Sequence, residues 1–551
     1  MPKTTTVGRY LVKRLEQAGL THVFGVPGDY VLKFDDLLVE SSMSFVTTCT
    51  EAGAGFAADA YARVNGLGAL CVTYCVGGLN ALNAVACAYA ERSPLIVISG
   101  APGVRERIRS PLLHHRVRDF NTQRLIYEHV TVASVVLDDA ARAPQQIDDT
   151  IRACTWNKRP VYIELPRDIV DAPCAAPGPW RARKAVSDAD ALGEAVQETV
   201  TMLRRAKRPA VLAGVEIQRW GLQDSLLRLI EHTGYPVAAT PLGKSVISER
   251  HPQYLGIYDG AMGLETVRRA VERADCLLFL GDYMTDVNLG IFTARLDPGR
   301  TVYAAQRRVS IKHHHYDGIY LDHFMDALRE ALPARPRARR GRPARKQKAF
   351  RPRPAGQLTV ARFFERLNGF IQDDSIVICD IGDSFFGALD LTIHRPTEFL
   401  SSAYYTTMGL AVPAAVGAQV KDRALRPVVI VGDGAFQMTG MELSTVARLD
   451  LNPIVFVLNN KGYVTERLIN EGPYNDVLDW AYHLWPQILK KGWGREVRTE
   501  GELEEALEAA RANVASFSII NVQLDPKDRS PALRRFGERL SVLGGRKHAP
   551  R

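Results

Sequence analysis

Two apolar segments in the last third of the chain end in residues that could bind a hard cation. Asp433 follows the apolar run 428–432, and Asn460 follows the apolar run 453–458. The carboxyl ends of parallel strands form the edge at which open α/β sheets bind their ligands, and carboxylate and amide oxygens suit Mg²⁺. We therefore expect Asp433 and Asn460 to bind Mg²⁺ through their side chains, and Gly462 to bind it through its carbonyl oxygen.

Glycines beside this predicted metal site would suit a diphosphate. Gly432 and Gly434 flank Asp433 and allow a close approach of phosphate to the backbone, and the start of the following helix adds partial positive charge. Gly-Asp-Gly alone is also a common turn, so two ordinary strand–helix loops are the alternative. The occurrence of both halves in this order favours a diphosphate bridged by Mg²⁺.

Acids and histidines elsewhere could transfer protons. Glu51 opens an alanine-rich helical stretch, Asp29 follows an apolar run and a Pro-Gly pair, His114 and His115 are adjacent, and Glu466 comes shortly after the metal motif. Each has an ordinary alternative: an ion pair within its own helix for Glu51, a helix cap for Asp29, and a solvated loop for the histidines. Grouped in one site, such side chains could act as general acids and bases.

The pair Gly-Asp-Gly and Asn-Asn, about 25 residues apart, resembles the diphosphate–Mg²⁺ motif of thiamine-diphosphate enzymes. The resemblance implies that Glu51 shares a proton with the N1′ atom of the cofactor's pyrimidine. It also implies that Met408, otherwise a core methionine, holds the cofactor bent, and that the Thr406 carbonyl accepts a hydrogen bond from the 4′-amino group. The cofactor-binding residues implied by the resemblance are Thr406, Met408, Gly382, Asp383, Gly432, Asp433, Gly434, Ala435, Asn460, Gly462 and Tyr463.

Within that superfamily, the chain resembles the 2-oxo acid decarboxylases from Val7 to about Asp525. In pyruvate, indolepyruvate and phenylpyruvate decarboxylases, an aspartate, two histidines and a glutamate surround the reactive carbon of the cofactor. The matching residues here are Asp29, His114, His115 and Glu466. The resemblance implies thiamine-diphosphate- and Mg²⁺-dependent, non-oxidative decarboxylation of a 2-oxo acid to an aldehyde and CO₂.

Residues 80–103 and 432–443 are especially similar to the indolepyruvate and phenylpyruvate branch, which implies an aromatic or bulky substrate. Cys75 and Gly78 stand where pyruvate decarboxylases have glycine and an acid, which makes pyruvate a doubtful main substrate. Asp383 stands where related enzymes tend to have a hydroxyl residue, and an ionised carboxylate cannot donate to phosphate.

Three other functions compete with this interpretation. The first is a thiamine-diphosphate carboligase, similar to acetolactate synthase, that forms 2-hydroxy ketones; a proton relay argues against it. The second is dinucleotide binding through the glycine-rich stretch 53–58, but no acid follows at the required distance. The third is a metal site at the basic tract 312–315, whose consecutive histidines cannot easily converge on one ion and better suit a surface role.

Composition and charge exclude further classes. The 551 residues carry a formal net charge of +9, yet ten basic residues and no acid lie between Pro333 and Pro354, and the stretch 529–551 holds seven basic residues against one acid. The remaining chain is mildly acidic, so we expect no nucleic-acid partner. No apolar run is long enough to span a membrane, and no signal-peptide core is present. Eight scattered cysteines without a CxxC pair indicate a cytoplasmic protein.

Short apolar runs alternate with longer amphipathic stretches, which predicts an α/β protein of three doubly wound parallel-sheet domains. By the resemblance, these are a pyrimidine-binding, a middle and a diphosphate-binding domain, in a homodimer or homotetramer. Each active site would combine the first domain of one subunit with the last domain of another. The predicted segments are 1–175, 188–332, a basic linker 333–355, 356–530, and a basic C-terminal tail 531–551.

Overall fold

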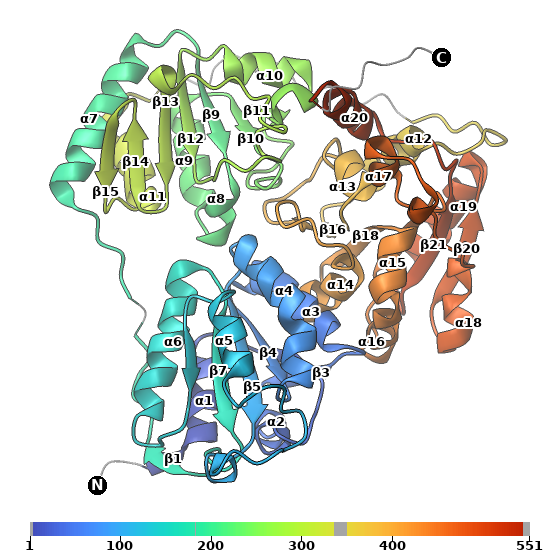
Figure 1. The fold of residues 1–551 in the computed structure, drawn as a ribbon. Coiled ribbons are helices and arrows are strands. Elements are labelled where there is room, and N and C mark those ends of the chain that lie inside the picture. The colour runs from blue at the N-terminus through green and yellow to red at the C-terminus, as the bar shows by residue number, and fades with distance from the viewer. Residues whose placement is uncertain (1–3, 182, 335–349, 544–551) are drawn as a thin grey trace.

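The computed structural model describes residues 4–181, 183–334 and 350–543, and each of its three domains is built on its own sheet (Figure 1). Their strands are short and apolar, and most are buried along their whole length, as expected for sheets covered by helices on both faces. The chain is therefore an α/β protein with three doubly wound domains. Among the described residues, no helix combines the length and the apolar character needed to cross a bilayer.

The first domain contains a six-stranded parallel sheet in the order β3-β2-β4-β5-β7-β6. Its strands are β2 (His22–Gly25), β3 (Ser44–Thr47), β4 (Gly68–Val72), β5 (Leu95–Ala101), β6 (Ser134–Val136) and β7 (Val161–Pro166). Its helices are α1 (Val7–Gln17), α2 (Leu32–Val39), α3 (Glu51–Asn65), α4 (Val76–Ala90), α5 (Thr122–Glu128) and α6 (Ala143–Asn157). A separate antiparallel pair joins β1 (Thr4–Thr6) to β8 (Pro173–Ala175).

The middle domain has a seven-stranded sheet in the order β11-β10-β9-β12-β13-β14-β15. Its strands are β9 (Pro209–Ala213), β10 (Val237–Ala239), β11 (Tyr254–Ile257), β12 (Cys276–Leu280), β13 (Thr301–Ala305), β14 (Arg308–Ile311) and β15 (His314–Asp317). Its helices are α7 (Ala189–Arg205), α8 (Val215–Arg219), α9 (Gln223–Thr233), α10 (Glu265–Glu272) and α11 (Leu321–Ala331).

One edge of the middle sheet departs from the expected parallel arrangement. β14 and β15 pair antiparallel with their neighbours because tight turns, rather than crossover helices, connect them. The histidine tract falls on this exposed hairpin: His314 Nδ1 lies 2.9 Å from Glu198 Oε2, and His315 Nδ1 lies 2.9 Å from Ser310 Oγ. The two side chains thus bind separate partners at the surface, as predicted for this tract.

The third domain contains a six-stranded parallel sheet in the order β17-β16-β18-β19-β21-β20. Its strands are β16 (Ser375–Cys379), β17 (Phe399–Ser401), β18 (Arg426–Gly432), β19 (Ile454–Asn459), β20 (Trp493–Val497) and β21 (Ser518–Gln523). Its helices are α12 (Val360–Asn368), α13 (Asp383–Ala388), α14 (Ala411–Lys421), α15 (Asp433–Thr439), α16 (Leu443–Arg448), α17 (Val464–Ile469), α18 (Trp485–Leu489), α19 (Glu500–Ala512) and α20 (Pro531–Leu543).

Helix α20 differs from the expected C-terminal tail. Residues 531–543 are helical, and Leu533 is fully buried while Phe536 is 9% exposed, because these apolar side chains pack on the third domain. The high basic content of the segment had concealed this apolar face. Most of the predicted linker, residues 335–349, and the end of the predicted tail, residues 544–551, lie outside the described residues.

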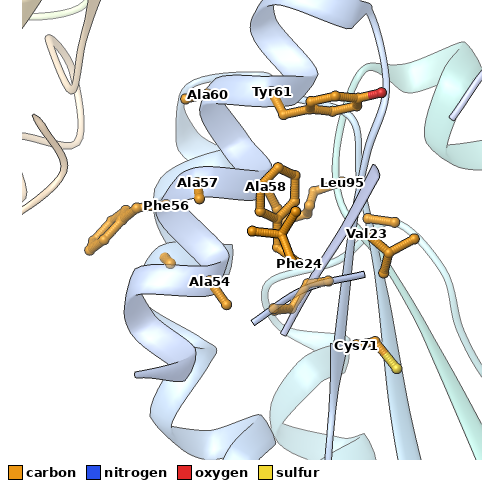
Figure 2. Packing of buried hydrophobic residues seen from close by; sticks show 14 of the residues in the cluster. Val23, Phe24, Ala54, Phe56, Ala57, Ala58, Ala60, Tyr61, Cys71 and Leu95 are labelled. Atoms are coloured by element: carbon orange, nitrogen blue, oxygen red, sulfur yellow. The ribbon is translucent and has the colours of Figure 1, made fainter. Parts of the chain in front are cut away.

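Helix α3 joins the first domain to the third. It is alanine-rich and almost entirely buried, and Figure 2 shows Ala58 and Tyr61 near Phe24 of the sheet. Its other side packs on α14, where a side chain at Gly417 would collide with the carbonyl oxygen of Ala57. Small residues are required at this contact because the two helix backbones approach so closely.

A buried ion pair strengthens the same contact. Arg63 binds Asp59 within α3 at 2.7 Å and also donates to the carbonyl oxygen of Ser401, 2.7 Å away, in the third domain. Both charged side chains are almost fully excluded from water. Truncating Arg63 would leave the buried charge of Asp59 without this partner, so this pair helps to fix the relative position of the two domains.

Candidate active site

Strands β18 and β19 bring the two halves of the predicted metal motif together. They are neighbouring parallel strands, with Gly432 opposite Leu458, so Asp433 and Asn460 emerge at the same edge of the sheet. The Asp433 carboxylate accepts hydrogen bonds from the backbone N–H groups of Gly434, at 2.7 Å, and Gly462, at 3.0 Å. Burial raises the pKa of Asp433 to about 6.

The amide oxygen of Asn460 is an acceptor without a partner. Oδ1 is buried and has no hydrogen-bond partner among the described residues, and the side chain as a whole is 6% exposed. Buried acceptors are normally satisfied, so this atom marks a place where a ligand fits. The carboxylate of Asp433, this amide oxygen and the carbonyl of Gly462 form a donor set suited to Mg²⁺.

The glycines of the motif have distinct roles. A side chain at Gly434 would collide with the ring of Tyr463, whereas the space around Gly432 is open. Gly462 has a φ of 152°, and a side chain there would collide with the carbonyl oxygen of Asn475. Gly434 and Gly462 are therefore needed for close packing, and Gly432 leaves room for a group next to the backbone at the start of α15.

The loop that carries Thr406 and Met408 is held in a conformation that its own residues do not favour. Thr406 has a φ of 57° and Gly409 a φ of 88°. The buried carboxylate of Asp380 accepts hydrogen bonds from the N–H groups of Gly409 and Ala411, each at 3.0 Å. Burial raises the pKa of Asp380 to about 6. The sequence-based prediction missed Asp380, although the residue ends an apolar strand just as Asp433 does.

Met408 is half-buried and packs against the core that the first and third domains share. The loop before it contacts the first domain: Glu91, at the end of α4, accepts hydrogen bonds from the N–H groups of Tyr404, at 2.6 Å, and Tyr405, at 2.9 Å. Glu91 is 1% exposed. A buried carboxylate of the first domain therefore helps to fix the backbone two residues before Thr406.

Gly382 and Asp383 lie at the beginning of α13, at the same edge of the sheet. Gly382 has a φ of 98°, which favours glycine. Asp383 is 6% exposed, and its Oδ2 accepts a hydrogen bond from the N–H of Ser530 at 2.8 Å. Oδ1 is buried without a partner among the described residues, as is the hydroxyl of Thr465.

Glu51 is the first residue of α3, where the Thr50 side chain caps the helix. Its Oε2 accepts a hydrogen bond from Asn80 Nδ2 at 2.6 Å. The buried Glu442 of the third domain accepts hydrogen bonds from the N–H groups of Cys49, at 3.1 Å, and Thr50, at 3.2 Å. The prediction missed both Asn80 and Glu442. Together they fix the side chain and the backbone around Glu51.

Asp29, His114 and His115 form one cluster in the first domain. His114 Nε2 lies 2.6 Å from Asp29 Oδ2, and His115 Nδ1 lies 4.0 Å from Asp29 Oδ1. The ring of Tyr30 stacks on that of His114 with a centroid separation of 4.8 Å. Loops after two different strands carry these residues, so the cluster arises only because the sheet places both loops at one edge.

Glu466 is separate from this cluster within the chain. It is an exposed residue of α17 in the third domain, and no hydrogen bond or ion pair between described residues connects it to Asp29, His114 or His115. The structure thus groups three of the four predicted relay residues. The fourth, Glu466, follows the predicted metal motif in the third domain.

Comparison with known proteins covers all three domains. Three family models match: the N-terminal TPP binding domain of thiamine pyrophosphate enzymes at residues 5–121, the central domain at 196–317, and the C-terminal TPP binding domain at 380–522. The chain is 36% identical to indole-3-pyruvate decarboxylase of Azospirillum brasilense, over 96% of each chain.

Plant relatives are similar at lower identity. Pyruvate decarboxylase 4 of Arabidopsis thaliana is 31% identical, over 99% of this chain and 93% of the relative. Pyruvate decarboxylase 1 of Pisum sativum is also 31% identical, over 99% of this chain and 95% of the relative. The similarity therefore covers all three domains of this chain and almost the full length of each relative.

Proposed function

Because this chain belongs to the thiamine pyrophosphate enzymes and is a thiamine-diphosphate-dependent 2-oxo acid decarboxylase, we propose that its substrate is an aromatic or bulky 2-oxo acid, such as phenylpyruvate or indolepyruvate, and that it requires Mg²⁺. The similarity to an indole-3-pyruvate decarboxylase supports the substrate class. The observation that carries the proposal is the cluster of Asp29, His114 and His115 beside a group of buried apolar and aromatic side chains: Tyr30, Tyr74, Cys75, Ala101 and Phe120.

The cofactor-binding residues fit a diphosphate and a cation. Asp433, Asn460 and Gly462 would hold Mg²⁺, and the partnerless amide oxygen of Asn460 supports this role. Thr406 and Met408 would contact the pyrimidine side, on a loop that Asp380 fixes. When bound, thiamine diphosphate supplies the electron sink that makes loss of CO₂ from a 2-oxo acid possible.

The residues of this chain would then position groups and move protons. Glu51 is oriented by Asn80 and would exchange a proton with pyrimidine N1′. Asp29, 2.6 Å from His114 Nε2, would orient that imidazole for proton transfer. His114 and His115 would deliver the proton that the aldehyde product requires, while Tyr30 keeps the His114 ring in place by stacking.

The loop around Cys75 and Gly78 supports a substrate other than pyruvate. Gln123 fills the space next to Gly78, where a side chain would collide with its amide, and Gln123 Oε1 accepts a hydrogen bond from Cys75 N at 2.6 Å. At the position that holds an acid in pyruvate decarboxylases, a side chain in this chain would displace the buried amide of Gln123.

A substrate panel tests this function. The purified enzyme, supplied with thiamine diphosphate and Mg²⁺, should release free aldehyde from phenylpyruvate or indolepyruvate with a higher kcat/KM than from pyruvate. A higher kcat/KM for pyruvate would overturn the substrate class. Hydroxyketone formation without free aldehyde would instead support a carboligase.

We also propose that a partner subunit completes the active site in a homodimer or homotetramer, which explains why Glu466 is separate from Asp29 and the histidines in one chain. Mixing inactive Glu51→Gln and Asp433→Asn chains under conditions that exchange subunits tests this. If each site combines two chains, a random mixture should recover about one quarter of wild-type activity, because half of the dimers then contain one intact site. No recovery, with exchange verified by mass spectrometry, would contradict the shared site.

A further inference from the structure

The side chain of Asp383 accepts a hydrogen bond from the C-terminal segment of the chain. Its Oδ2 accepts the N–H of Ser530 at 2.8 Å, although 147 residues separate the two in sequence. Ser530 is fully buried, and its hydroxyl accepts the N–H of Leu533 at 3.0 Å, so it caps the first turn of α20. The carboxylate therefore lies at the positive end of that helix, where a negative charge is stabilised.

The side chains of α20 extend this contact to α13, the helix that Asp383 begins. The rings of Phe386 and Phe536 lie 4.8 Å apart between centroids, and Leu533 is fully buried in the same core. The start of α20 is thus attached to α13 by one charged hydrogen bond and by apolar packing. Figure 1 shows α20 lying over α13 and α17.

The same C-terminal segment also holds α17, the helix that carries Glu466. Arg467 donates to the carbonyl oxygen of Pro526 at 3.2 Å and to that of Lys461 at 3.1 Å, next to the metal motif. Leu468 lies against Gly537, where an added side-chain carbon would be 3.2 Å from its methyl group. These contacts join the two residues that follow Glu466 to the segment that includes α20.

Helix α17 needs such support. It has six residues, and only Val464 among them is buried. An isolated helix of this length is unstable in water, so contacts with other parts of the protein must fix its position. The contacts made by Arg467 and Leu468 therefore determine where Glu466 lies.

We propose that Asp383 is a positioning residue that fastens α20 to the start of α13, and that α20 in turn holds α17 and Glu466 in place. This inference rests on the proposed function for the role of Glu466, but the attachment of α20 stands on the geometry alone. A hydroxyl residue at this position would be neutral. The carboxylate of Asp383 carries a negative charge, which the amino-terminal end of α20 stabilises.

Hydrogen–deuterium exchange of the full-length enzyme, with and without thiamine diphosphate and Mg²⁺, tests the attachment. Asp383→Ala removes the acceptor, and Asp383→Asn keeps an oxygen that Ser530 N–H can reach. In the alanine variant, exchange in peptides covering 531–543 and 464–469 should rise by about 10- to 100-fold, the range expected when a hydrogen bond to a charged acceptor is lost. The asparagine variant should remain within about threefold of wild type.

Activity gives a second readout. The kcat of the loaded enzyme should fall in the alanine variant and recover in the asparagine variant, in parallel with exchange. Unchanged exchange in α20 in the alanine variant would overturn the proposal. A uniform rise across β18 and β19 as well would also overturn it, since that indicates general destabilisation rather than release of α20.

A second pair of variants applies if Asp383→Ala does not fold. Ser530→Pro removes the N–H donor together with the hydroxyl, whereas Ser530→Ala keeps the N–H and loses the hydroxyl, which caps Leu533 and also interacts with Asp383. Greater exchange in α20 and α17 for the proline variant than for the alanine variant supports the attachment, and equal exchange contradicts it. If wild type forms no aldehyde but the variants still show these exchange differences, the proposed function fails while the attachment of α20 holds.

Discussion

Replacing Asp380 by asparagine should weaken cofactor binding by disturbing the loop that carries Thr406 and Met408. Asp380 Oδ1 accepts hydrogen bonds from the N–H groups of Ile381, at 3.1 Å, and Gly409, and Oδ2 accepts from those of Gly409 and Ala411. An amide has only one oxygen. In either orientation, its NH₂ group would face the N–H of Ile381 or of Ala411.

The size of the effect follows from that mismatch. A buried N–H without an acceptor costs about 1–3 kcal/mol. The loop has little intrinsic preference for its shape, since Thr406 lies in the left-handed region with a φ of 57°. If the loop relaxes in the free enzyme and must be reordered on binding, cofactor affinity should fall by about 5- to 150-fold.

Fluorescence titration with thiamine diphosphate at saturating Mg²⁺ measures this affinity, and thermal unfolding reports stability in parallel. Thr439→Val is the matched control, because it removes one neutral hydrogen bond to the Gly409 carbonyl, 2.7 Å long, from the same loop. Its effect should stay below about tenfold. Cofactor affinity of the Asp380→Asn variant within about twofold of wild type would refute the reasoning.

Three further predictions concern the site itself. Glu51→Gln should lower kcat by more than about 100-fold. The unfolding temperature should stay nearly unchanged, because Asn80 can still donate to the amide oxygen. Steady-state kinetics and calorimetry check these two effects, and retained turnover would contradict the role of Glu51. Asp29→Asn should reduce the rate of aldehyde release by about 10- to 100-fold more than it weakens substrate binding, because His114 loses its charged partner. Rapid-quench kinetics separates the rate of aldehyde release from the affinity for substrate. Burial raises the pKa of Asp433 to about 6, so its proton must leave before Mg²⁺ binds. Protonation of this group should therefore weaken the binding of Mg²⁺ and cofactor about tenfold as the pH falls from 7 to 5. The folded apo enzyme binds that proton more tightly than the unfolded chain, so the contribution of this group to stability is present at low pH and is lost as the pH rises from about 4 to about 6. Calorimetric proton release near pH 5.5, corrected for ionisation of the free ligand, should approach about one proton, and zero would contradict it.

Local pattern was sufficient for much of the fold and for part of the site. Asp433 and Asn460 each follow an apolar strand, and neighbouring parallel strands place their carboxyl ends at one edge, so their proximity could be inferred before any coordinates. The same reasoning would have found Asp380, which ends β16 beside β18. Like Asp433, Asp380 directly follows an apolar run of the sequence.

Other residues could not be predicted, because their roles depend on partners far away in the chain. Glu442 binds backbone groups near Glu51 across 393 residues, and Asp383 meets Ser530 across 147. No local sequence motif signals either contact. The C-terminal segment was predicted as a tail because its charge is conspicuous, whereas the spacing of Leu533 and Phe536 becomes meaningful only when α13 and α17 provide a surface to cover.

The strand–helix alternation, the predicted metal motif and the types of residue that could transfer protons follow from the amino-acid sequence, because periodicity and side-chain chemistry encode them over short spans. Which carboxylates hold backbone groups in place, how the loop with Thr406 is held, and that Glu466 lies apart from Asp29 and the histidines depend on the packing of distant segments. Those properties come from burial and from hydrogen bonds between distant segments. They arise only when separate sheets pack together, which no local pattern records.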